Sequence, residues 1–475
     1  MAVSNVTFYE RVEEALHDRQ LQTALDISTT RFTTGRKNAL AALPEAEALR
    51  DHARRIRAHT IAHLDRYLAQ FADAVEQTGG QVHWAETAAE ANHIVANLAL
   101  SRNVKNVVKS KSMVSEELHL NQTLEAHGMR VVETDLGEYI AQLAEEKPSH
   151  IIAPVIHKTR EDVANLFRRK LQATDEDLTD VPHMTALARR VLRNEFLQAD
   201  MGVSGCNFAV AETGSICLVT NEGNGRLTTT TPRLHVALMG MERLVPTMED
   251  LGVMLQILAR SATGQKTSVY TNIITGPRRT AAGQPVEPDG PDELHVVIID
   301  NGRSQILGSE LAEILYCIRC GACLNACPVY QQIGGHAYNS VYQGPVGSVV
   351  TPGLYGLDPW HELPQASTLC GACREVCPVR INIPRMLLKL RSEAVEAGLN
   401  PGWLKWSLGL YRQAVVRPSK YHFGSQLTSW ISQKVADNGW IKNLPGPLSG
   451  WTDHRDFPAL AKKSFSQRWR EERNQ

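Results

Sequence analysis

Seven of the nine cysteines lie between residues 317 and 377, a density typical of either disulfide-bonded or metal-binding proteins. The N-terminal segment MAVSNVTFYERVEEALHDRQ mixes acidic and basic residues and lacks the apolar core of a secretory signal. We therefore expect the chain to be cytoplasmic. Because the cytoplasm keeps thiols reduced, the cysteine cluster predicts metal ligation rather than disulfides.

The first cysteine group reads CIRCGACLNACP, which is C-x2-C-x2-C-x3-C-P. In two-cluster ferredoxins, the first three thiolates of this motif wrap one cubane iron-sulfur cluster, while the fourth reaches the neighbouring cluster. A ten-residue unit, CGACLNACPV at 320–329, returns as CGACREVCPV at 370–379. The repeat predicts a pseudo-twofold pair of cluster sites.

The crossed arrangement of such ferredoxins assigns the ligands. The first cluster takes Cys317, Cys320, Cys323 and Cys377, and the second takes Cys327, Cys370 and Cys373. Ser367 stands where the first copy has Cys317, so the second cluster lacks a fourth cysteine. Three outcomes stay open: a [4Fe-4S] cluster completed by Ser367 or solvent, a [3Fe-4S] cluster, or a distant ligand such as Cys206 or Cys217.

Two other kinds of metal centre use clustered cysteines. Zinc sites also contain C-x2-C pairs, but they do not require three evenly spaced cysteines and a Cys-Pro in each of two copies. A radical-generating cluster needs three cysteines spaced x3 and then x2, and no such triplet occurs. Electron relay is the chemistry that the pattern favours.

The remaining sequence predicts several domains, because 475 residues exceed what one core usually supports. Residues 1–70 are expected to form a helical lead-in. Short apolar runs alternate with helix-length stretches through 71–302, which predicts an α/β domain with a largely parallel sheet. Residues 303–392 form the predicted ferredoxin-like iron-sulfur domain, and 393–475 a Trp-rich basic C-terminal region. The connection between the two cysteine groups is expected to be irregular rather than helical.

Charge and motifs restrict the partners. The chain has 50 Lys and Arg against 51 Asp and Glu, which argues against a general nucleic-acid-binding surface. No run approaches the roughly 18 apolar residues of a membrane span, so any membrane contact would be peripheral. No G-x-G-x-x-G joins a strand to a helix and no flavin motif is present, so we expect neither NAD nor flavin.

Several segments together resemble a known family, the iron-sulfur B subunit of LutABC-type L-lactate utilisation systems. They are KSKSMVSEE at 109–117, AETGSICLVTNEGNGR at 211–226, CIRCGACLNACPVY, LCGACREVCPV, and the C-terminal WTDHRDFPALAKKSF. The resemblance implies a LUD domain similar to the sugar-phosphate isomerase and CoA-transferase fold. It also implies two [4Fe-4S] clusters on the seven cysteines, the second with three, and two partners: a second iron-sulfur subunit and a LUD-type subunit.

The α/β region offers only weak candidates for a substrate site. The stretch AETGSICLVTNEGNGR is expected to form a hairpin or strand pair with its turn at Glu212 and Thr213. Its bend at Gly223 and Gly225 could combine with Lys109, Lys111, Arg278 and Arg279 into an anion pocket. His157 and His235 could accept a proton, but each is better explained as a satisfied core or surface histidine. No catalytic residue is assigned.

Three functions are consistent with these features. The first is the electron-transfer subunit of a complex that oxidises L-lactate to pyruvate and passes electrons to an unknown acceptor. The second is the same role for another 2-hydroxy acid such as glycolate. The third is an isomerase or acyl-transfer enzyme in which the clusters are structural.

Overall fold

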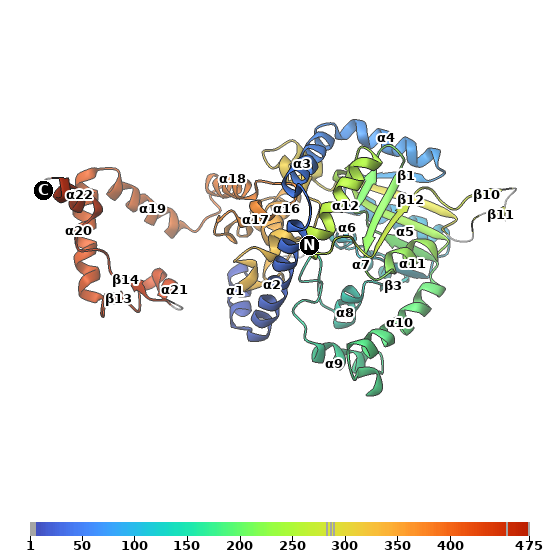
Figure 1. The fold of residues 1–475 in the computed structure, drawn as a ribbon, viewed down its shortest axis with the longest axis horizontal. Helices are drawn as coiled ribbons and strands as arrows, with labels where there is room; N and C mark the ends of the chain where they lie inside the picture. Colours follow the sequence, from blue (N-terminus) through green and yellow to red (C-terminus); the bar gives the residue numbers. More distant parts are fainter. Residues whose placement is uncertain (1–5, 282–283, 286, 288–289, 453–454, 474–475) are drawn as a thin grey trace. The chain divides into compact units, whose positions relative to one another are not determined.

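The computed structural model describes residues 6–281, 284–285, 287, 290–452 and 455–473 (Figure 1). The chain divides into two compact units, Met1–Glu396 and Ala397–Gln475. The first unit contains four leading helices, a six-stranded and a four-stranded β-sheet, the short antiparallel pair β10 (Thr280–Ala281) and β11 (Gln284–Pro285), and the whole cysteine region.

The leading helices are α1 (Phe8–His17), α2 (Arg19–Ala41), α3 (Ala46–Ala62) and α4 (Leu64–Gln77). Thr7 and Glu10 form a capping box at the start of α1, where each side chain accepts a hydrogen bond from the other's backbone N–H. Helix α4 buries Leu64, Phe71 and Val75 on one face because these residues recur at helical spacing.

The central sheet has six parallel strands in the order β1-β12-β7-β4-β2-β3. Their bounds are β1 (Gln81–Ala85), β2 (Asn106–Lys109), β3 (Arg130–Glu133), β4 (Met201–Ser204), β7 (Leu234–Gly240) and β12 (Glu293–Ile299). Every residue of β7 is buried, and its alternate side chains enter two different hydrophobic cores on the two faces of the sheet. The predicted α/β fold with a parallel sheet is confirmed.

Helices connect these strands (Figure 1). They are α5 (Ala88–Ser101), α6 (Met113–Leu118), α7 (Leu120–Ala126), α8 (Leu136–Ala144), α9 (Arg160–Lys170), α10 (Val181–Gln198), α11 (Asn224–Thr230) and α12 (Met248–Ala262). The loops that follow β2 and β4, residues 110–112 and 205–207, leave the carboxyl edge of the sheet, where ligand sites of open α/β folds usually lie.

A second sheet has four strands in the order β8-β5-β6-β9. They are β5 (Phe208–Val210), β6 (Ser215–Thr220), β8 (Leu244–Val245) and β9 (Tyr270–Ile274). The predicted hairpin or strand pair with its turn at Glu212 and Thr213 is confirmed, because β5 and β6 pair antiparallel, although they belong to a sheet separate from the parallel one. Gly214 makes its turn at φ 66°, and a Cβ there would lie 2.5 Å from the Val75 backbone nitrogen, so only glycine fits.

Helices of 4 to 14 residues make up much of the cysteine region. They include α13 (Arg303–Leu307), α14 (Ala322–Asn325), α15 (Tyr330–Ile333), α16 (Gly344–Tyr355), α17 (Ala372–Val376) and α18 (Ile383–Glu396), with a 3₁₀ turn at Ala312–Tyr316. The expectation of an irregular connection between the cysteine groups was wrong, because α16 occupies its centre. Pro345 lies in the first turn of α16, where its missing N–H costs no hydrogen bond.

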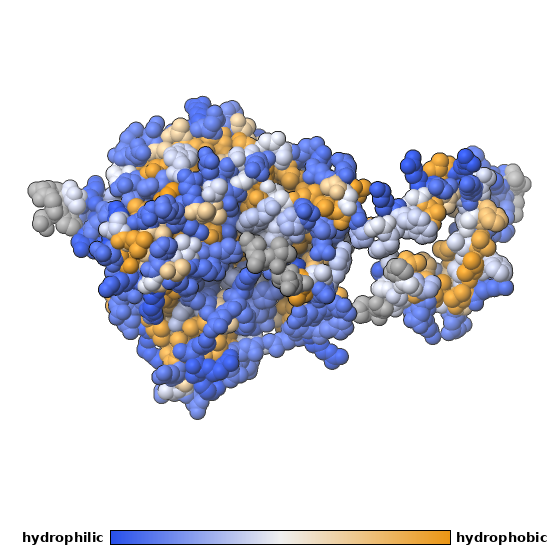
Figure 2. All heavy atoms as spheres, turned by 180° about the vertical axis from the view of Figure 1, so that it is seen from behind, coloured by the Kyte–Doolittle hydropathy of each residue, from blue (hydrophilic) through white to orange (hydrophobic). Residues whose placement is uncertain are grey.

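The C-terminal unit is formed by α19 (Gly402–Val415), α20 (Pro418–Val435), α21 (Ser449–Thr452), α22 (Phe465–Arg473) and the short paired strands β13 (Trp440–Ile441) and β14 (Phe457–Pro458). Its six tryptophans are between 49% and 69% exposed. Figure 2 shows apolar side chains on the surface of this unit. Among the described residues, no helix combines the length and apolar character needed to cross a bilayer.

Candidate metal centre

The two cysteine groups repeat one backbone conformation. Arg319 and Leu369, which are equivalent in the repeat, both adopt left-handed φ values, 58° and 57°. Gly321 and Gly371 follow at 73° and 86°. Left-handed backbone is costly for residues other than glycine. Its recurrence at equivalent positions shows that both loops are wound tightly in the same way.

Ser367 takes the structural place of Cys317 in the second copy. The Arg319 N–H donates to Cys317 Sγ at 3.4 Å, and the Leu369 N–H donates to Ser367 Oγ at 3.1 Å. This equivalence supports the alignment of the repeats. It leaves open which group completes the second cluster.

The first space bordered by thiols lies inside the larger unit. Four cysteines line it, three from the first group and one from the second: Cys317, Cys320, Cys323 and Cys377. Its other lining residues are mostly apolar and include Ile151, Val346 and Ile383, and Arg319 also lines it. The residues that the sequence assigns to the first cluster are thus brought together across 60 positions of chain, from Cys317 to Cys377.

The remaining cysteines form a second neighbourhood nearer the surface. The Cys327 and Cys373 thiols are close enough to interact electrostatically with each other and with Cys370. Cys327 and Cys373 are buried, whereas Cys370 is exposed. Helices α14 and α17, which carry one cysteine of each group, pack against each other. Within the described ranges, no group of three or more His, Cys, Asp or Glu side chains is arranged around a single metal ion.

The other two cysteines lie in the second sheet and the loop before it. Cys217 belongs to β6, and its carbonyl accepts a hydrogen bond from Asn207 N–H. Burial raises the pKa of both the Cys206 and the Cys217 thiols to about 12. Cys206 borders a different cavity, described below.

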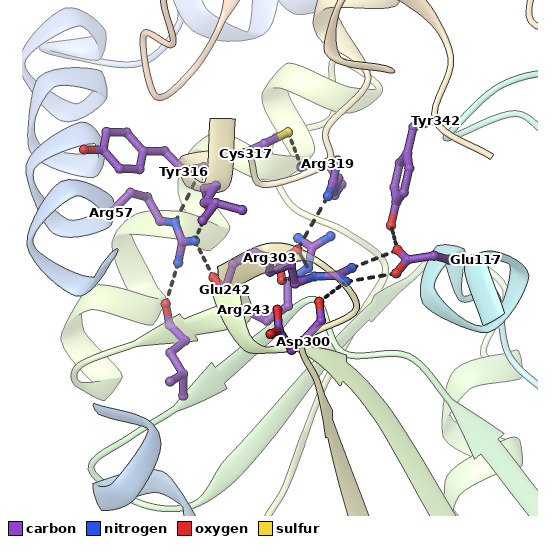
Figure 3. A network of polar contacts seen from close by, with 12 residues as sticks. Arg57, Glu117, Glu242, Arg243, Asp300, Arg303, Tyr316, Cys317, Arg319 and Tyr342 are labelled. Carbon is purple, nitrogen blue, oxygen red and sulfur yellow. Dashed lines mark hydrogen bonds and ion pairs between the residues drawn. The ribbon is translucent and has the colours of Figure 1, made fainter. Parts of the chain in front are cut away.

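A network of buried charged residues lies beside the loop that carries Cys317 (Figure 3). Arg303 of α13 donates to Glu117 at 2.9 and 2.8 Å and to Glu242 at 2.7 Å. Tyr342 also donates to Glu117, and Asn301 Nδ2 donates to its other oxygen at 2.7 Å. Arg303, Glu117 and Glu242 are each no more than 1% exposed in their side chains.

Three further arginines approach this network (Figure 3). Arg57 of α3 donates to the carbonyls of Glu242, Leu244, Leu315 and Tyr316, and so joins α3 to β8 and to the turn before Cys317. Arg319 lies 4.3 Å from the Tyr342 ring centre, with Nη2 3.5 Å from Glu242. Arg243 Nε lies 3.7 Å from the same carboxylate.

The cations keep both carboxylates ionised. Burial by itself would raise the pKa of Glu242, but Arg303, Arg243 and Arg319 hold it well below its usual value. Burial likewise opposes ionisation of Glu117, but Arg303 lowers its pKa together with two further hydrogen-bond donors, Tyr342 and Asn301. The network of four arginines and two glutamates therefore carries a net positive charge beside Cys317.

A cavity of about 250 Å³ opens at the carboxyl edge of the parallel sheet. Residues from the loops after β2 and β4 line it, as do β6 and α12. Arg319 and Ile151 line both this cavity and the space bordered by the four thiols. One wall therefore separates the two.

The structure does not bring the predicted anion-binding residues together in one pocket. Lys109 is fully buried and pairs with Glu116 and Glu133, both at 2.7 Å, so its charge is already compensated. Arg278 pairs with Asp292 and Arg279 with Glu287, and neither arginine lines the large cavity. Only Lys111 lies at its edge, where Nζ donates to the Ile152 carbonyl at 3.1 Å.

The predicted turn and the two histidines have structural partners. Glu212 accepts from the Met248 N–H at 3.1 Å, and Thr213 donates to Ser215 at 2.8 Å. Both ring nitrogens of His157 are within hydrogen-bond distance of partners, Ser149 Oγ at 2.7 Å and Glu146 Oε2 at 2.8 Å. His235 is buried in β7, with Nε2 2.8 Å from Ser204 Oγ. These contacts favour the structural interpretation of both histidines.

His235 makes stability depend on pH. Burial, and then nearby His295, lower its pKa from 6.5 to about 3, so the folded protein binds fewer protons than the unfolded chain between these values. Stability should therefore fall as pH drops below 6.5, by about 1.4 kcal/mol per pH unit for this group. Denaturant unfolding of the wild type and of His235→Gln between pH 7.5 and 5 should show a shallower slope in the variant. Parallel slopes would contradict the prediction.

Comparison with known proteins finds a family match for each of three regions of the chain. Residues 68–299 match a LUD domain, 313–381 a 4Fe-4S dicluster domain, and 405–474 the C-terminal domain of lactate utilisation protein B. Lactate utilization protein B of Bacillus pumilus is 46% identical over 468 residues, covering 98% of this chain and 97% of the relative. The chain belongs to the lactate utilisation protein B family. The protein of the same name from Geobacillus kaustophilus is also 46% identical, with the same coverage of each chain.

A solved structure gives a weaker likeness. The crystal structure of a DUF162 family protein from Deinococcus radiodurans covers 50% of this chain and 98% of its own, at 15% identity and a TM-score of 0.28. Membership of the lactate utilisation protein B family instead rests on the near full-length relatives. The resemblance inferred from the sequence segments is confirmed.

The buried charged residues near Cys317 were not predicted from the sequence. Arg319 lies between two predicted ligands in CIRC, and Glu242 with Arg243 interrupts the apolar run LHVALMGMERLVP. Charged residues inside a cluster-binding loop or an otherwise buried strand are a usable signal, because burying a charge is costly unless it is paired. Arg57, in a charged helix, gave no such signal.

Proposed function

We propose that this chain is the electron-transfer subunit of a complex that oxidises L-lactate to pyruvate. The 4Fe-4S dicluster match at 313–381 supports iron-sulfur clusters, and its relatives are named for lactate utilisation. The observation that carries the proposal is the joining of both cysteine groups around one space, because a crossed pair of ligand sets is typical of proteins that relay electrons between two clusters.

The donor residues fit two clusters. Cys317, Cys320, Cys323 and Cys377 would hold the first, and Cys327, Cys370 and Cys373 would hold the second, with both proposed to be [4Fe-4S]. Bound clusters of this kind supply one-electron acceptors and donors whose potentials depend on burial and hydrogen bonds. The Arg319 N–H directed at Cys317 Sγ supplies one such bond.

The protein's own residues have identifiable tasks in this scheme. Arg57 fixes the turn before Cys317 by donating to the Leu315 and Tyr316 carbonyls. Arg50 donates to the Cys377 carbonyl at 2.8 Å and so holds the second group against α3. The net positive charge of the arginine network attracts the negatively charged thiolates of the first site and so stabilises their deprotonated form.

The test of this function begins with anaerobic reconstitution. We expect a brown protein with broad sulfide-to-iron absorption and about eight iron and eight labile sulfide per chain if both clusters are [4Fe-4S]. Electron paramagnetic resonance of the oxidised protein would reveal a [3Fe-4S] second site. A colourless protein that contains zinc would refute the proposal.

Growth tests the role of the chain in lactate oxidation. Deletion of the gene in a host without another lactate oxidase should abolish growth on L-lactate, and the intact chain should restore it. If the deletion abolishes growth on glycolate but not on L-lactate, glycolate is the favoured substrate. Turnover of a sugar phosphate or thioester by the isolated chain would support the isomerase or acyl-transfer alternative.

A further inference from the structure

We propose that the cavity of about 250 Å³ at the carboxyl edge of the parallel sheet binds a small 2-hydroxy or 2-oxo monocarboxylate, with Arg243 and Arg319 holding the carboxylate. The inference deepens the proposed function, since it assigns the organic acid to this subunit. It rests on that function for the identity of the acid, but not for the existence of the site.

The position of the cavity is the first argument. It lies where the loops after β2 and β4 leave the sheet, at residues 110–112 and 205–207. Open α/β sheets bind ligands at the carboxyl ends of their strands because loop backbone and side chains converge there. The cavity volume is large enough for an acid of three to four carbons with accompanying water.

The second argument is a pair of guanidinium groups with spare donors. The side chains of Arg243 and Arg319 are each 8% exposed, and both residues line the cavity. Arg243 Nε and Arg319 Nε and Nη1 are buried without a hydrogen-bond partner among the described residues. Buried donors of this kind are costly to leave unpaired. A carboxylate can accept hydrogen bonds from guanidinium groups in a favourable planar geometry.

Neutral polar groups in the same cavity lining favour a hydroxy or oxo acid. Ser110 Oγ and Thr220 Oγ1 are also buried without a partner in the described part of the chain, and both residues line the cavity. A hydroxyl can donate or accept, so it suits both the alcohol and the ketone form of such an acid. Leu258 and Val219 provide an apolar surface for a short carbon chain.

Two acidic residues of the cavity lining argue against a multiply charged ligand. Asp135 and Glu222 line the cavity, and both accept hydrogen bonds from the first turn of α8. Burial, and then the nearby Asp135, raise the pKa of Glu222. A second negative charge on the ligand would face these carboxylates, whereas a monocarboxylate places its only charge against the arginines.

The shared wall connects this site to the first cysteine group. Arg319 belongs to the loop between Cys317 and Cys320, and it lines both the cavity and the space bordered by the four thiols. A ligand that contacts Arg319 therefore changes the electrostatic surroundings of the first site. Binding should be visible in the spectrum of the cluster held there, independently of any turnover.

The experiment uses the full-length reconstituted chain under argon. Equilibrium dialysis with radiolabelled L-lactate and pyruvate should show saturable binding at one site per chain, and equimolar inorganic phosphate should not displace either acid. Arg243→Gln should weaken binding at least tenfold, the loss expected for one charge-assisted hydrogen bond. Saturating pyruvate should also shift the paramagnetic resonance signal of the reduced wild-type protein.

Two further variants control the result. Val219→Phe narrows the cavity without removing a charge and should weaken binding at least as much as Arg243→Gln. Arg279→Gln makes the same chemical change at an 81% exposed side chain outside the cavity and should leave binding unchanged. Iron and sulfide contents equal to wild type would show that each variant is folded and loaded.

Several outcomes would overturn the inference: no saturable binding of either acid, equal binding by wild type and both cavity variants, or displacement by phosphate. The proposed function fails differently. Preferential binding of glycolate would sustain the cavity site and refute lactate as substrate. If growth on lactate requires the chain but the purified chain binds neither lactate nor any other acid, the proposed function stands and the cavity site is refuted.

Discussion

Replacing Cys377 by alanine is expected to abolish the cluster of the first cysteine group, although Cys377 lies in the second motif. Conversely, Cys327→Ala should abolish the second cluster and spare the first. The reason is that Cys377 borders the same space as Cys317, Cys320 and Cys323, whereas Cys327 lies with Cys370 and Cys373. Each variant should lose roughly half of the iron, and electron paramagnetic resonance would identify which signal remains.

The control for these variants is Cys217→Ala, which removes a buried thiol of β6 and should keep the full iron content. An uncrossed arrangement predicts the opposite pair of results, with Cys327→Ala eliminating the signal of the first site. That outcome would refute the ligand assignment while leaving an iron-sulfur protein.

Arg303→Met is expected to destabilise the larger unit by about 3 to 5 kcal/mol, because it leaves two buried carboxylates without their closest cation. Glu117 and Glu242 both accept hydrogen bonds from this guanidinium, and both are buried. Methionine keeps most of the side-chain volume, so the loss would come from the charge rather than from a cavity. Urea unfolding under argon measures the difference in free energy.

A matched substitution at a partly exposed pair provides the comparison. Arg102 pairs with Glu293, and their side chains are 30% and 38% exposed. Arg102→Met should cost only about 0 to 1 kcal/mol, since solvent screens the exposed charges. Similar losses in the two variants would mean that the buried network contributes no more than an ordinary surface pair.

The sequence predicted the parts of the fold that depend on local spacing. The cysteine repeat, with its glycines, predicted two equivalent loops, and the structure gives Gly321 and Gly371 the same left-handed conformation. Apolar runs between amphipathic stretches predicted the parallel sheet. In these cases the determining residues are neighbours in sequence, so their pattern is visible without knowledge of the fold.

Other features depend on partners far apart in the chain. The β5–β6 hairpin belongs to a separate sheet because β6 also pairs with β9, which no local pattern indicates. Arg57 and Glu242 are 185 residues apart, and Arg303 and Glu117 are 186 apart. The predicted anion pocket failed at Lys109 for the same reason, since Glu133 neutralises it from an adjacent strand.

The strand order also governs when each part of the molecule can take shape during synthesis on the ribosome. Strand β12 lies between β1 and β7, so the parallel sheet stays divided until residue 299 has been made. The last ligand proposed for the first cluster, Cys377, follows later still. On this ligand assignment, every strand of the parallel sheet has been synthesised before the first cluster can gain its fourth cysteine, so complete ligation of that cluster would be a late event in the biogenesis of the protein.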